Sequence, residues 1–120
     1  MLMVALMVAG CGSALHTVAN VSEVVAYGSL ACDAGSTRWA MHAGGYAEVN
    51  PVMGAEPSSG MIAGYFTGIS SAVFAMNRAF SVHHEAAGDV WRVATNLVVL
   101  AMEQDAIRGN HDAGVPLCGY

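Results

Sequence analysis

The sequence contains no lysine, and charged residues make up only 11% of it. Soluble domains usually carry about 25% charged residues. The four cations are arginines scattered singly along the chain, so no basic patch is available to neutralise a phosphate backbone. The nine acidic residues are also dispersed, with a net charge of −5 and no acidic run. We therefore expect neither a nucleic-acid partner nor an acidic interaction tail.

The motifs that usually carry catalysis or metal binding are also missing. The sequence has no Cys-x2-Cys or His-x3-His pair, no Gly-x-Ser-x-Gly nucleophile motif, and no glycine-rich loop followed by lysine. Histidines and carboxylates are present, but their spacing matches no known pair of metal ligands. We predict a protein that is not an enzyme, with no metal site and no cofactor.

Apolar residues are what the chain has in quantity. They make up 55% of its 120 positions and give a mean hydropathy of +0.48. This composition favours membrane association over a cytosolic globule. The length is sufficient for one domain.

The N-terminal run Leu2–Ala9 ends in Val8-Ala9-Gly10-Cys11, which resembles a bacterial lipobox. In such a signal the cysteine thiol receives a diacylglycerol and becomes the new N-terminus. We therefore predict a lipoprotein signal over residues 1–10, lipidation of Cys11, and a single helical domain over residues 11–120. The alternative is an uncleaved membrane helix, because Met1 to Ser22 carries no charge.

The periodicity predicts an all-α fold, a small membrane-associated bundle of three to four helices. In the first helix the packing stripe recurs at intervals of four and three, and is formed by Ala14, Val18, Val21, Val25, Gly28 and Cys32. We interpret the opposite stripe, which includes Glu23, as a solvated face. Asp33 is suited to begin a short helix that ends at Gly44-Gly45, unless the first helix simply continues.

Two further helices are predicted after residue 57. Ser58 to Asn77 is free of charge and would measure about 30 Å as a helix, which makes it the best transmembrane candidate. It carries a small-residue ridge for packing against another helix, formed by Gly60, Gly64, Gly68 and Ala72. The last helix is expected to start at Asp89 and stop at Gly109, with an apolar stripe of Val90, Val93, Leu97 and Leu100.

A proline-containing connector separates these segments, because Pro51 and Pro57 cannot sit inside a regular helix without removing a backbone bond. It also holds Glu48 and Asn50. We predict a polar centre formed by Asp33, Thr37, Glu48 and Asn50. In it Glu48 and Asn50 bind backbone groups or helix ends around the turn, with Asp33 or Thr37 as partners.

The pattern Asp33-x3-Thr37, then Glu48-x-Asn50-Pro51-Val52-Met53-Gly54-x2-Pro57-Ser58, resembles a group of small proteins encoded by phages, prophages and bacteria. The similarity continues through Tyr65-Phe66 to Asn110 and Gly114, and so covers about Cys32 to Gly114. It implies a bacterial or phage origin and a compact, helical, membrane-associated form, but no mechanism. Ser36 stands where that group more often has glutamine.

The three cysteines fit this picture if Cys11 is lipidated. An even pair then remains, which implies a Cys32–Cys118 disulfide in a compartment that permits one. The alternative is that both are buried free thiols.

The expected function is that of a membrane-anchored protein of the bacterial envelope, in the inner or the outer membrane. Its role would be structural or interactive, in superinfection exclusion or as a lysis accessory. The expected partners are membrane lipid, an envelope or phage protein, or a second copy. Two alternatives are a holin-like pore former and a small envelope enzyme centred on Glu48, Asn50 and Asp33.

Overall fold

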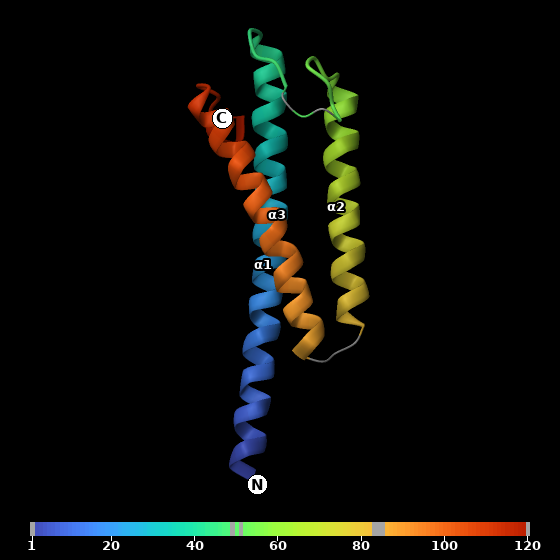
Figure 1. Cartoon of the computed structure of the whole chain (residues 1–120), viewed down its shortest axis with the longest axis vertical. Helices are drawn as coiled ribbons and strands as arrows, with labels where there is room; N and C mark the ends of the chain where they lie inside the picture. Colours follow the sequence, from blue (N-terminus) through green and yellow to red (C-terminus); the bar gives the residue numbers. More distant parts are fainter. Residues whose placement is uncertain (1, 49, 51, 83–85, 120) are drawn as a thin grey trace.

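The computed structural model describes residues 2–48, 50, 52–82 and 86–119, with side chains from residue 12 onward. These ranges form three α-helices, α1 (Leu2–Ala43), α2 (Ser59–Ser81) and α3 (Ala86–Asp112), and a short 3-10 turn, η1 (Leu117–Gly119). The helices lie side by side in an up-down-up bundle of 65 × 24 × 19 Å, and α1 extends past the other two at its N-terminal end (Figure 1). The predicted all-α bundle is confirmed.

The first two helices follow the sequence pattern closely. α1 is continuous over 42 residues, so Asp33 lies inside it and begins no new helix. α2 starts after Ser58, whose hydroxyl oxygen accepts a hydrogen bond from the Met61 N–H at 3.2 Å. This is the usual role of a serine N-cap, which satisfies one of the free N–H groups of the first turn.

Both predicted limits of the last helix are wrong. α3 begins at Ala86, so Asp89 lies in its first turn, and it continues through Gly109 to Asp112. Its end is set instead by Gly114, which has φ +87° and donates its N–H to His111 O, while Val115 N–H bonds to Asn110 O at 2.9 Å. This closure is a Schellman motif. A glycine inside a helix costs only about 1 kcal/mol, so the packing of α3 on α1 outweighs it.

After α3 the chain returns to α1. Cys118 forms a disulfide with Cys32, and Val115 is buried against the bundle. The two backbones approach so closely that a Cβ atom on Gly35 would overlap the carbonyl oxygen of Cys118. The returning segment, residues 115–119, is called the C-terminal strap below.

The interior of the bundle is unusually polar. A hydrophobic cluster of Leu30, Met53, Ile62 and Phe66 packs near the connector. Polar or charged side chains fill much of the remaining interior. Those that are buried are Asp33, Ser36, Thr37, Asn77, Arg92, Asn96 and Glu103.

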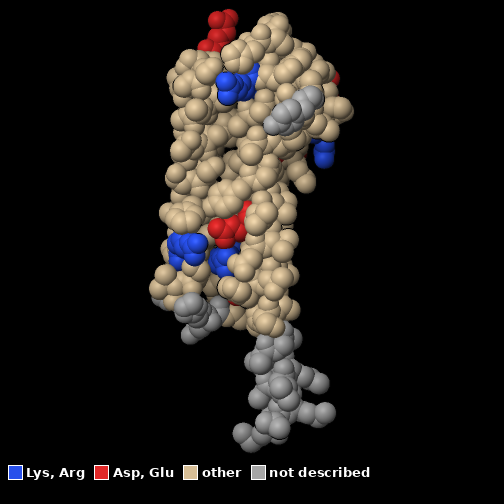
Figure 2. Space-filling view, turned by 180° about the vertical axis from the view of Figure 1, so that it is seen from behind, with Lys and Arg blue, Asp and Glu red and all other residues tan. Residues whose placement is uncertain are grey.

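The exterior, in contrast, is largely apolar. The exposed hydrophobic residues of the helices form what we call the apolar belt: Val18, Val21, Val24 and Val25 of α1, Met61, Phe74 and Met76 of α2, and Val90, Trp91, Leu97, Val98 and Met102 of α3. The face drawn in Figure 2 is mostly uncharged, with one group of charged side chains near its upper end and another in its lower half. Single exposed apolar residues are common in soluble proteins, but a polar interior combined with an apolar surface is not.

Two stripe assignments made from the sequence are therefore wrong. On α1, Val21 is 57% exposed although it belongs to the predicted packing stripe. On α3, Leu97 is 55% exposed, whereas Arg92 and Asn96 are buried. Periodicity identifies which residues share a helix face, but it does not say which face points inward. Here the polar faces point inward because their side chains bind one another.

Candidate functional site

Polar side chains meet between the helices at three levels. At the level of the first turns of α3 lies the ion-pair cluster: His16, Asn20, Glu23, Asp89 and Arg92. In the middle is the asparagine layer: Ser22, Asn77 and Asn96. Near the connector lies the carboxyl pair, Asp33 and Glu103, with Asn110 beside it.

The ion-pair cluster is built around Arg92, which is only 5% exposed. Its guanidinium donates to Glu23 at 2.8 Å, to Asp89 at 3.0 Å and to Asn20 at 2.8 Å. His16 lies 3.2 Å from Asp89 at the exposed edge. One buried cation thus neutralises two carboxylates and joins α1 to α3, as a buried charge requires.

The asparagine layer connects all three helices. Asn77 of α2 donates to Asn96 of α3 at 2.9 Å and to the Val73 carbonyl at 3.0 Å. Asn96 donates to the hydroxyl of Ser22 on α1 at 3.0 Å. Both asparagines are essentially inaccessible to solvent. Such amide pairs fix the rotation of each helix, because a misaligned helix would leave a buried amide without a partner.

The carboxyl pair lies at the connector end of the bundle. Asp33 and Glu103 are each 8% exposed, and their carboxyl groups are close enough to hydrogen bond to each other. Asn110 Nδ2 donates to Asp33 Oδ1 at 3.0 Å. Burial, and then the negative charge of Glu48, raise the pKa of Asp33 to about 6, although its hydrogen bonds with Asn110 and Glu103 oppose this rise. Burial, and then the charge of Asp33, raise the pKa of Glu103 to about 7.

The predicted polar centre is partly assembled at this end. Thr37 is buried on α1, one turn beyond Asp33. In the connector, Glu48 Oε1 accepts from Asn50 N–H at 2.8 Å, and Asn50 Oδ1 accepts from Val52 N–H at 2.9 Å. Glu48 and Asn50 thus bind backbone groups of the turn. Among the described residues, Asp33 bonds to Asn110 and not to the connector, although the charge of Glu48 still reaches it.

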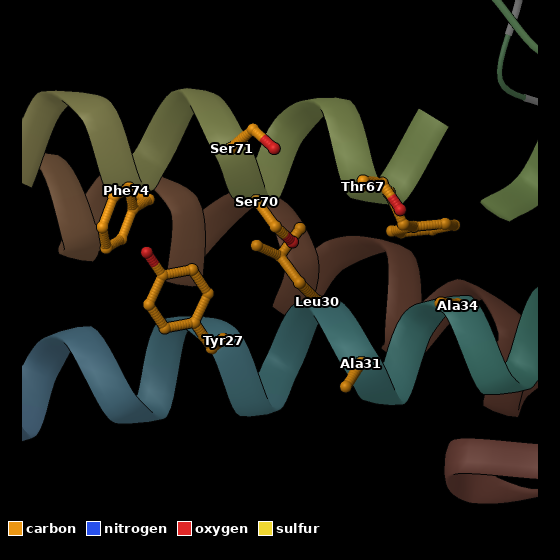
Figure 3. Close-up of a pocket in the computed structure, with 9 residues that line it drawn as sticks. Tyr27, Leu30, Ala31, Ala34, Thr67, Ser70, Ser71 and Phe74 are labelled. Atoms are coloured by element: carbon orange, nitrogen blue, oxygen red, sulfur yellow. The ribbon is translucent and has the colours of Figure 1, made fainter. Parts of the chain in front are cut away.

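An open groove of 480 Å³ runs between α1 and α2. Figure 3 shows Tyr27 rising from α1 towards Phe74 of α2, with Ser70 and Ser71 along the opposite wall. The Tyr27 hydroxyl oxygen is buried and has no hydrogen-bond partner among the described residues. The groove is therefore mainly an apolar surface with hydroxyl groups at its edge.

The small-residue ridge of α2 faces outward from the described part of the bundle. Gly60, Gly64, Gly68 and Ala72 are all exposed, and a Cβ atom on Gly64 or Gly68 would meet nothing within 4 Å. Its use for packing against a helix of another molecule stays a prediction. The lipidation of Cys11 also stays a prediction, because that side chain lies outside the part of the chain described here.

Among the described residues, no group of three or more His, Cys, Asp or Glu side chains is placed to hold a metal ion. Comparisons with protein-family models, with curated proteins and with solved structures find no match. Inferences about function therefore rest on the geometry of the interior and of the surface.

Sequence reasoning missed Arg92, Asn96 and Glu103 as interior residues. The signal was present, because positions 92, 96 and 103 are separated by four and seven residues and share one face of a helix. Because these residues are polar, the sequence pattern favoured the apolar stripe of the same helix as the inward face instead. Asn77, at the end of the uncharged stretch of α2, was missed for the same reason.

Proposed function

We propose that this chain is an integral membrane protein of the bacterial envelope, with a structural or interaction role and no catalytic one. The observation that carries the proposal is the polar interior inside an apolar belt. In water this distribution is unfavourable, because apolar side chains stay hydrated while polar groups lose water. In a bilayer the belt contacts hydrocarbon, and the polar groups avoid lipid by binding one another.

The properties of α2 support this proposal. α2 is 23 residues long and apolar enough to cross a membrane, and as a helix it would extend about 34 Å. Only 17% of its apolar window is buried inside the bundle, whereas the core helix of a soluble protein would be mostly buried. Because α1 and α3 pack beside α2, their outward-facing sides would contact lipid as well (Figure 1).

Exposed polar and charged side chains reappear at the connector end of the belt. Past Glu103, α3 exposes Gln104, Asp105 and Arg108, and past Asp33, α1 exposes Arg38. The carboxyl pair lies towards this connector end of the belt. The Cys32–Cys118 disulfide lies at the same end, which favours an oxidising compartment such as the periplasm for this end.

Within this proposal, membrane lipid is the partner of the belt. The ridge and the groove on α2 are the surfaces that another copy, or an envelope or phage protein, would contact. A phage or prophage origin, and a role in superinfection exclusion or lysis, rest on the sequence resemblance alone.

Fractionation of cells that express the chain tests the membrane assignment. We expect the protein in the membrane fraction after an alkaline wash, and its release by detergent. The Cys11→Ser variant should behave in the same way, because the bundle itself contacts the bilayer. If that variant became soluble, the chain would be held by a lipid anchor and not by its helices.

A second test uses matched surface substitutions on α3. Val98 is 60% exposed in the middle of the belt, so Val98→Arg should cost about 2.5–3.5 kcal/mol of insertion free energy and lower the membrane-bound amount. Gln104→Arg, at an exposed position beyond the belt, should leave that amount unchanged. A Val98→Arg protein recovered in higher soluble yield with unchanged helical content would contradict the proposal.

A further inference from the structure

The carboxyl pair differs from the ion-pair cluster in how its charges are balanced. In the ion-pair cluster Arg92 stands between Glu23 and Asp89 and supplies positive charge to both. The charged groups that act on the carboxyl pair are Asp33, Glu103 and Glu48, all of them acidic. They come from α1, α3 and the connector.

The other elements around the pair bring no compensating cation. Asn110 of α3 is neutral, and the C-terminal strap contributes the disulfide. The only charged residue of α2, Arg78, lies in its last turn, away from the connector. Two carboxyl groups are thus held more than nine-tenths buried without an opposite charge, an arrangement that costs several kcal/mol when both are ionised.

The hydrogen bonds around the pair show that a donor is lacking. Asp33 Oδ1 accepts from Asn110, but Glu103 Oε2 is buried and has no hydrogen-bond partner among the described residues. The neighbouring polar group is the carboxyl of Asp33, which is also only an acceptor when ionised. A single proton placed between the two carboxyl groups would supply the donor and remove one charge.

We propose that Asp33 and Glu103 form a proton-binding site that holds one shared proton at neutral pH. The ligand is a proton and not a metal ion, because only two carboxyl groups converge there and the described residues include no group of three His, Cys, Asp or Glu side chains that could hold a metal. Loss of this proton places two adjacent negative charges between α1 and α3, with Glu48 close by. The site thus links pH to the packing of these helices at the connector end.

The direction of the pH effect follows from the raised pKa values, about 6 for Asp33 and about 7 for Glu103. An unfolded chain releases these protons near pH 4. Between about pH 4 and 7 the folded protein therefore binds more protons than the unfolded one, so stability falls as the pH rises through this window. Below pH 4 the two carboxyls are protonated in both the folded and the unfolded chain. Above about pH 8 they are ionised in both, and the loss of folding stability is complete.

The test measures the unfolding equilibrium of the full chain in detergent micelles as a function of pH. For the wild type we expect the unfolding constant to rise by about 10- to 100-fold from pH 5 to pH 8, as the loss of one shared proton requires. Glu103→Gln should reduce this rise to less than about threefold, because an amide supplies the donor at every pH. The control Asp105→Asn, at an exposed position of α3, should keep the wild-type dependence.

Infrared spectroscopy of the carboxyl groups provides a second measurement that does not depend on unfolding. At neutral pH the wild type should show one protonated carboxyl, absent in Glu103→Gln and in Asp33→Asn but present in Asp105→Asn. A wild-type spectrum with no protonated carboxyl would overturn the proposal. Stabilisation at pH 8 by millimolar NaCl or CaCl2, lost in Glu103→Gln, would also overturn it and identify a cation site instead.

Discussion

Arg92 is a full positive charge held inside a bundle whose surface is apolar. Its guanidinium binds Glu23, Asp89 and Asn20, so each of its neighbours depends on it for charge balance or hydrogen bonding. Its Nε atom is buried without a hydrogen-bond partner in the described part of the chain. Arg92 thus binds α1 to α3 at this level of the bundle, at the cost of one unsatisfied buried N–H.

We therefore predict that Arg92→Leu destabilises the protein by about 3 kcal/mol, because Glu23 and Asp89 would be left partly buried without this cation. The measurement is the free energy of unfolding in detergent. Arg108→Leu is the matched control on the same helix, since Arg108 is exposed, and it should change stability by less than about 0.5 kcal/mol. Equal losses in the two variants would mean that the buried ion pairs contribute nothing specific.

At the scale of an element, α1 is the helix on which the rest is assembled. Its N-terminal part extends past the bundle, its middle carries Ser22 and Glu23 towards α3, and its last third meets the C-terminal strap (Figure 1). Gly35 is the position where the strap comes closest. Without a side chain there, the carbonyl of Cys118 can lie directly on the helix surface.

Gly35→Ala should therefore displace the strap and reduce the fraction of molecules with an oxidised Cys32–Cys118 pair, because the added Cβ atom overlaps backbone and not a flexible side chain. Thiol labelling on a non-reducing gel measures that fraction. Gly28→Ala is the control on the same helix: the space around Gly28 is open, so this variant should keep the disulfide and gain about 0.5–1 kcal/mol. A fully oxidised Gly35→Ala protein would contradict the close approach.

Helices were the part of the fold that the sequence predicted well. The uncharged stretch located α2, and the prolines located the connector, because these signals act within a short segment of chain. The orientation of each helix was not accessible in the same way. Whether Asn96 or Leu97 faces inward depends on partners on other helices and on the solvent around the bundle.

The candidate site was predictable only where its residues lie in one local turn. Glu48 and Asn50 are two residues apart and bind nearby backbone groups, which the sequence suggested. Glu103 and Asn110 meet Asp33 from a helix about 70 residues further on, and nothing in the local pattern of α3 singles out that contact. Such a pairing emerges only from the packing of α3 on α1.

At the scale of the whole molecule, the disulfide closes a loop that contains α2 and α3. Its two cysteines are 86 positions apart. In the chain-entropy model a loop of this length contributes about 4–5 kcal/mol by restricting the unfolded chain. The bond also fixes the C-terminal strap next to the carboxyl pair, because Cys32 directly precedes Asp33 in α1.

Cys118→Ser should accordingly lower the free energy of unfolding by about 4–5 kcal/mol under oxidising conditions, and by little when a reductant is present. Chemical denaturation with and without dithiothreitol measures the difference. The double variant Cys32→Ser/Cys118→Ser should match the single one. A wild-type protein whose stability does not respond to dithiothreitol would show that the bond is absent in solution or adds nothing.

The Cys32–Cys118 bond also has a consequence for the order of events during synthesis. Cys32 leaves the ribosome well before α2 and α3 exist, whereas its partner follows both of them in the sequence. The correct bond therefore cannot form until both helices have been translated and the strap has returned to α1. In a pulse-chase experiment, the appearance of the oxidised form would mark the moment at which each newly made molecule has completed its tertiary assembly.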